Sequence, residues 1–229
     1  MLKRGIKITL LSALVVLFIA SMGGQANAQL QMDLDYEFSG ATEPQGPGPS
    51  WLTATFDNVD SDTVLLTMDA SGLIDDESVK NWLFNFQYSD ATNLSFAYQS
   101  GAVASITTDD DPNNVLQADG DGYFDIEFMF VDDTFSRDSG ASLTSVYEIT
   151  YSPGITFNSF NYESTPDGGP GVYYSAAQVQ DINGENQDSG WIGDGNGGTI
   201  VPEPVSSTLF LVGAATLGFR RFRKQKSIR

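Results

Sequence analysis

Asp125 and Glu127 are the two side chains whose types and spacing best fit a chemical reaction. They lie two residues apart in a run that alternates acidic and apolar residues, so in a strand both carboxylates project from one face, roughly 6 to 7 Å apart at the backbone. This spacing is compatible with the carboxylate pair of a glycosidase. The alternation alone also explains them as the solvent-exposed side of a core strand, so we expect no catalytic residue here.

Two acidic clusters, at 109–111 and 119–121, raise the question of calcium binding. An EF-hand loop that begins at Asp119 needs an oxygen side chain at its fifth position, but Tyr123 stands there. Turn formation and solvated charge account for both clusters. We therefore assign no metal ligand and no cofactor.

Histidine and cysteine are both absent from the 229 residues. Their absence excludes Ser-His-Asp and Cys-His nucleophilic chemistry, the usual zinc sites and most general-base catalysis near neutral pH. It also means that an exported domain would rely on its own core without disulfides. We expect a protein that is not an enzyme.

Four aromatic residues, Trp82, Phe84, Phe86 and Tyr88, share one face of a predicted strand. Such a row is usually part of a core, although it could also form a platform on which sugars stack. The second interpretation would make the protein a carbohydrate-binding or glycosidase-like β-sandwich. Burial of the row would remove that platform.

The elements that would position these residues are short strands, because apolar residues recur with a period of two. Turns rich in Gly, Pro, Asn and Asp separate the runs, and 75–81 could form a single helical turn. We predict an all-β fold, an antiparallel sandwich of jelly-roll or Ig-like kind, and we prefer the jelly-roll-like alternative. The predicted strands span about 31–38, 51–56, 63–69, 82–88, 94–98, 103–107, 124–130, 145–151, 155–161 and 172–180.

The charges are strongly segregated along the chain, whose overall net charge is −19. Between residues 29 and 201 there are 29 acidic residues against two cations, Lys80 and Arg137, a net charge of −27. A nucleic acid would be repelled by such a domain, so this class of partner is excluded.

The first 28 residues have the layout of a secretory signal peptide. Three cations precede an apolar run at 8–20, and Ala26 and Ala28 place small residues where a signal peptidase needs them. Cleavage would leave Gln29 as the first residue. An uncleaved N-terminal anchor is the less favoured alternative, because the apolar run is short.

The last 29 residues combine a proline motif, an apolar run and a basic end. The motif is Val201, Pro202, Glu203 and Pro204, and the two prolines allow a helix to start only after them. A helix over 205–219 would span roughly 22 Å, somewhat short of a hydrocarbon core of roughly 30 Å. The basic tail would hold its end on the cytoplasmic side. This tail comprises Arg220, Arg221, Arg223, Lys224 and Lys226.

This C-terminal arrangement resembles the PEP-CTERM sorting signal of exported bacterial proteins. The resemblance implies an exosortase-type membrane protease as partner and a host that makes extracellular polysaccharide. Val205 and Ser206 stand where serine and threonine often follow the motif, and Phe222 and Gln225 interrupt the basic run. The alternative is an ordinary tail anchor or a plain transmembrane helix.

Together these patterns predict a signal peptide (1–28), an exported β-sandwich domain (29–190), a flexible linker (191–200) and a sorting signal (201–229). We expect a non-enzymatic protein that is anchored in the membrane before processing and then lies on the cell surface or in the extracellular matrix. Exopolysaccharide or biofilm is its expected association. No ligand is identifiable from the residues themselves.

Overall fold

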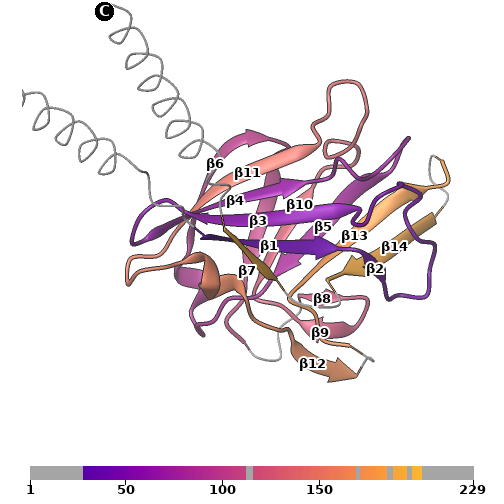
Figure 1. Ribbon diagram of the computed structural model, residues 1–229. Helices are drawn as coiled ribbons and strands as arrows, with labels where there is room; N and C mark the ends of the chain where they lie inside the picture. The colour runs from indigo at the N-terminus through magenta and orange to yellow at the C-terminus, as the bar shows by residue number, and fades with distance from the viewer. Residues whose placement is uncertain (1–27, 112–115, 169–170, 185–187, 195–197, 203–229) are drawn as a thin grey trace, which may run out of the picture. The chain divides into compact units, whose positions relative to one another are not determined.

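Alternating apolar residues form the strands of this protein, as the first strand illustrates. In β1 (Ala28–Leu34) the side chains of Leu30, Met32 and Leu34 are fully buried, whereas the residues between them are partly exposed. The prediction of an all-β fold built from antiparallel sheets is confirmed (Figure 1).

The computed structural model describes residues 28–111, 116–168, 171–184, 188–194 and 198–202. Outside them lie most of the predicted signal peptide, including Ala26, and the chain from Glu203 onward. The predicted helix at 205–219 and the basic tail at 220–226 are therefore not described. Among the residues that are described, no helix is long and apolar enough to cross a membrane.

The described strands form two six-stranded sheets and a small third sheet. The first sheet contains, in order, β15 (Thr199–Pro202), β1, β3 (Leu52–Asn58), β4 (Thr63–Asp69), β11 (Thr144–Thr150) and β6 (Ser95–Gly101). The second contains β2 (Tyr36–Glu37), β14 (Asp188–Gly193), β13 (Ser175–Ile182), β5 (Ser78–Phe84), β10 (Ile126–Phe130) and β7 (Ala104–Thr108). The third contains β12 (Thr165–Gly168), β9 (Asp121–Tyr123) and β8 (Gln117–Ala118).

One apolar core joins the two large sheets, as in a sandwich. Phe56 of the first sheet meets Phe84 of the second edge to face, with ring centroids 5.3 Å apart, and Phe128 contacts Tyr147 at 5.2 Å. Each fully buried side chain of this size stabilises the fold by roughly 1.5 to 3 kcal/mol. The contacts between the aromatic rings also favour particular orientations of the rings relative to one another.

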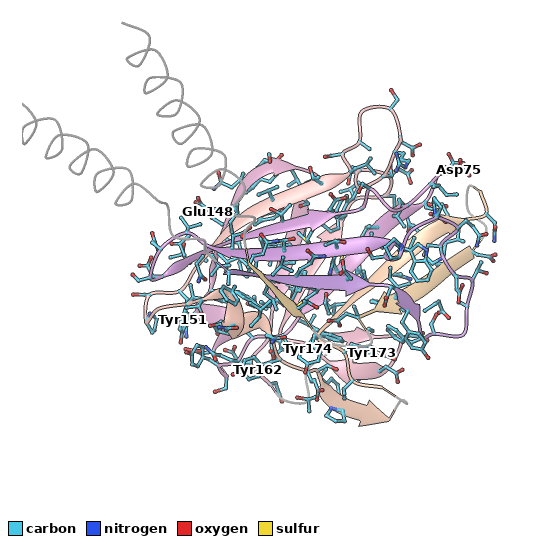
Figure 2. All side chains as sticks on the ribbon, viewed as in Figure 1. Asp75, Glu148, Tyr151, Tyr162, Tyr173 and Tyr174 are labelled. Carbon is cyan, nitrogen blue, oxygen red and sulfur yellow. The ribbon has the colours of Figure 1, made fainter. Side chains whose placement is uncertain are left out.

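A second apolar cluster lies between β5, β13 and the small sheet. It contains Leu83, Leu116, Ala118, Phe124, Tyr173 and Ala176. Phe38 stacks on Tyr173, which Figure 2 labels, with ring centroids 4.2 Å apart. The strand predicted at 124–130 would place Phe124 on one face with Ile126 and Phe128, but Phe124 lies in this second cluster and the other two lie in the main core. β10 begins only at Ile126, so the alternation is interrupted before it.

Three further predicted segments differ from the structure. The predicted strand at 155–161 contains the 3₁₀ helix η2 (Phe157–Phe160), because the Thr156 and Ser159 side chains cap its first turn. The predicted helical turn at 75–81 instead leads into β5. The predicted linker at 191–200 contains the end of β14 and the start of β15, and Ile192 within it is fully buried.

Gly101 provides a test of the tight corner between β6 and β7. Its φ is +90°, and a Cβ built there would lie 2.0 Å from the carbonyl oxygen of Thr144. Gly140 is a matched control, because its φ is +95° but nothing lies within 4 Å of an added Cβ. We expect Gly140→Ala to cost about 1 kcal/mol of unfolding free energy and Gly101→Ala about 1 to 3 kcal/mol more. Urea unfolding measures both, and equal losses would contradict the close approach.

Candidate functional site

Asp125 links the end of β5 to the start of β10. Its Oδ2 atom accepts a hydrogen bond from the backbone N–H of Phe86 at 2.7 Å, and its own N–H donates to the carbonyl of Phe84 at 3.1 Å. The backbone N–H of Asp109 donates to the carbonyl of Asp125 at 2.9 Å. Hydrogen bonds of Asp125 therefore connect the end of β5, the segment just after β7 and the start of β10.

Asp125 and Glu127 are both partly buried, and burial raises the pKa of each carboxyl. The pKa of Asp125 rises to about 6, because burial outweighs the hydrogen bond from Phe86, and Asp110 and Asp109 add repulsion. The pKa of Glu127 is raised by burial alone. The sequence analysis placed both acids on the solvent-exposed side of a core strand, whereas the structure leaves both only partly exposed. Neither acid lines the cleft described for this fold between β6 and β7.

The predicted aromatic row belongs mainly to the core. Trp82, Phe84 and Phe86 are at most 5% exposed, and the indole N–H of Trp82 donates to the hydroxyl of Ser175 at 2.8 Å. Tyr88 is 43% exposed and stacks on Tyr151 at 5.6 Å. The row therefore provides no sugar platform, and the core interpretation of its first three members is confirmed.

The two acidic clusters organise turns. Asp119 and Gly120 form the two-residue turn between β8 and β9, with φ values of 52° and 78°, as a type I′ hairpin requires. The carboxylate of Asp110 accepts hydrogen bonds from the backbone N–H and the hydroxyl of Thr92, and that of Asp109 accepts from the N–H of Asp111. Within the described part of the chain, no three acidic side chains are grouped as metal ligands.

Asp194 is a buried carboxylate that the sequence analysis missed, because it fell in the predicted linker. It is 3% exposed, and its Oδ1 atom accepts the backbone N–H groups of Tyr174 at 3.0 Å and Ser175 at 2.8 Å. Its Oδ2 atom has no partner among the described residues. Burial raises the pKa of Asp194 to about 7 against the effect of these hydrogen bonds, and Asp35 raises it further.

The residues predicted for processing lie at the two ends of the described domain. Ala28 and Gln29 begin β1, and Gln29 is opposite Asp57 of β3. Val201 and Pro202 end β15, which lies next to β1 in the first sheet. The remaining motif residues, Glu203 and Pro204, lie outside the described residues.

Comparison with known proteins finds no matching family model, no matching curated protein and no matching solved structure.

Asp194 leads to a prediction about pH. A carboxyl that ionises near pH 7 when folded and near 3.8 when unfolded makes stability fall as pH rises between these values, by at most about 1.4 kcal/mol per pH unit. Asp194→Asn removes the titration and keeps an oxygen acceptor. We expect this variant to gain stability over the parent protein as pH rises from 4 to 7, measured by urea unfolding. Asp138→Asn, at an exposed site, is the control for loss of one charge. A gain in stability that is independent of pH would contradict a raised pKa of Asp194.

Proposed function

We propose that this protein is a non-enzymatic, exported cell-surface or extracellular-matrix protein that is sorted through its C-terminal Pro-Glu-Pro signal. Export would use the N-terminal signal peptide with cleavage after Ala28. An exosortase-type membrane protease would then act on the tail. Before this processing, the helix at 205–219 would anchor the chain in the membrane, and exopolysaccharide is the proposed association afterwards.

The joint occurrence of three features carries this proposal. The motif Pro202-Glu203-Pro204 is followed by the short apolar run at 205–219 and then by the basic end at 220–226. The charge of the domain supports an extracellular location, because a strongly acidic surface favours solubility.

The absence of catalysis is supported by how the best-spaced carboxylates are used. Asp125 accepts a backbone N–H within the fold, and it stabilises the connection between β5 and β10. A structural role therefore accounts for its burial. We also propose that the sandwich is jelly-roll-like, because successive strands repeatedly change sheets, from β4 to β5, β5 to β6, β6 to β7 and β10 to β11.

A glycosidase-like protein is the second candidate, and one observation favours it. The pKa of Asp125, raised to about 6, approaches the range that a general acid needs, and Glu127 follows two residues later. The aromatic row does not support this candidate, because most of it is buried.

The sorting proposal predicts a defect that is confined to the tail. Glu203→Ala with Pro204→Ala should leave export intact but stop C-terminal processing, because the protease would lose its recognition motif. Mass spectrometry of the mature protein, from cells with and without the sorting protease, measures this. Ser207→Ala with Thr208→Ala is the control outside the motif. A mature mass that is the same with and without the protease would overturn the proposal.

The non-enzymatic proposal predicts that Asp125 and Glu127 do no chemistry. Asp125→Asn with Glu127→Gln keeps the size and hydrogen-bonding oxygens of both side chains. We expect neither the parent protein nor this variant to cleave the polysaccharide that the producing cells secrete, as judged by release of reducing ends. Circular dichroism checks that the variant is folded. Cleavage by the parent protein and not by the folded variant would establish the glycosidase instead.

A further inference from the structure

Residues 91–108 form the longest uncharged run of the predicted exported part of the chain, eighteen residues between Asp90 and Asp109. This run contains β6 and β7. Each lies at the end of its sheet, so the uncharged segment occupies one edge of both large sheets.

A cleft of about 430 Å³ lies between these two strands, within the range of roughly 300 to 1,000 Å³ that is usual for ligand pockets. Five of its eight lining residues are apolar, and none is charged. Phe96, Ala104 and Ile106 pack against the main core, whereas Val103 and Tyr98 are 58% and 47% exposed. The cleft therefore leaves the edge of the main core open to solvent.

The four edges of the large sheets differ in how they are protected against pairing with another chain. Short strands, prolines and bulges all discourage such pairing. β2 has two residues, β15 ends in Pro202, and β6 has an irregular register opposite Val146 and Tyr147. β7 has none of these features, because all five of its residues pair regularly with β10.

Two residues of β7 have backbone groups without a partner among the described residues. The N–H of Asp109, just after the strand, donates to the chain on the β10 side. Alternation therefore points the N–H and carbonyl groups of Ile106 and Thr108 away from β10, towards the open edge. Ala104 has the same orientation, but its N–H already donates to the Tyr147 hydroxyl at 2.7 Å. Ile106 and Thr108 thus remain available for pairing.

Uncompensated carboxylates lie at the end of this edge. Asp109 and Asp110 follow β7 directly, and their carboxylates accept hydrogen bonds from uncharged groups. Burial, then Asp110 and Asp109, raise the pKa of the neighbouring Asp125 to about 6. The ion pair of the described residues, between Lys80 and Asp132, lies at the other end of β10. The open edge is therefore uncharged along its length and negative where β7 ends.

We propose that β7 binds an extended segment of a partner protein that has apolar side chains at alternate positions and basic residues at its N-terminal end. The segment runs antiparallel to β7 and exchanges hydrogen bonds with the backbone of Ile106 and Thr108. Its side chains opposite these two residues lie on the same face as theirs and enter the cleft. Its basic residues lie opposite Asp109 and Asp110. This partner is independent of the sorting signal.

Charge and backbone geometry together select this occupant. Residues 29–201 have a net charge of −27, so an acidic partner is repelled, whereas a basic segment is attracted. The uncharged cleft takes up apolar side chains without burying a carboxylate of its own lining. Free backbone groups alternate along β7 with the spacing of a strand, which a peptide matches and a polysaccharide does not.

A labelled peptide, Arg-Arg-Val-Thr-Val-Thr-Val, tests the pairing when it is titrated into the full chain and followed by fluorescence anisotropy. We expect saturable binding that weakens as salt is added. N-methylation of the two valines nearer the arginines removes the donors that face Ile106 and Thr108, so binding should weaken roughly tenfold. N-methylation of the two threonines, whose N–H groups face solvent, is the matched control and should leave binding unchanged. Equal losses from both modifications would overturn the proposal.

Two variants of the chain test where the arginines lie. Asp109→Asn with Asp110→Asn keeps the accepting oxygens and should weaken binding severalfold. Asp75→Asn with Asp76→Asn is the control, because it removes two charges just before β5, at the end of the second sheet away from Asp109 (Asp75 is labelled in Figure 2). Circular dichroism checks that both variants are folded.

Three outcomes would overturn the proposal. They are the absence of saturable binding by the unmodified peptide, equal weakening in the two folded variants, and displacement of the peptide by maltoheptaose. The last outcome would assign the cleft to a neutral glucan instead.

Discussion

Backbone N–H groups, rather than cations, hold the carboxylates of this domain. Glu77 is 2% exposed and accepts the N–H groups of Gln45 and Ile74, and Asp194 accepts those of Tyr174 and Ser175. Within the described part of the chain, one ion pair forms, between Lys80 and Asp132. A domain with 29 acids and two cations can pair few of its carboxylates with charges, so turns and strand ends supply the donors.

This constraint also determines how the two apolar clusters are divided. The hydrogen bond between Asp125 and Phe86 lies just before β10 begins at Ile126. At this point the regular alternation of side chains facing the main core is interrupted. Phe124 consequently packs in the second cluster, while Ile126 packs between the two large sheets. The acid that looked most like a catalytic residue therefore stands at a junction of the packing, where its burial has a structural cause.

The sequence predicted local periodicity well and long-range contacts poorly. β4 spans Thr63–Asp69 as predicted, because a strand with clean alternation between turn residues needs no distant partner to be recognised. Asp194 could not be found in this way, since its burial depends on the pairing of β13 with β14 and on the N–H groups of Tyr174 and Ser175. The raised pKa of Asp125 likewise arises first from its burial and then from Asp110 and Asp109, which are distant in the sequence.

The acidic composition has a further consequence for how the sheets are kept from extending. The edges of an open sheet expose unpaired N–H and C=O groups, which can pair with a strand of another chain. Here like charge acts at long range, while the two residues of β2 and the proline of β15 act locally. Long-range repulsion depends on ionic strength, but a short strand or a proline does not. The edge strand β7 therefore differs from β2 and β15. It is neither very short nor ended by a proline, and none of its own residues is charged.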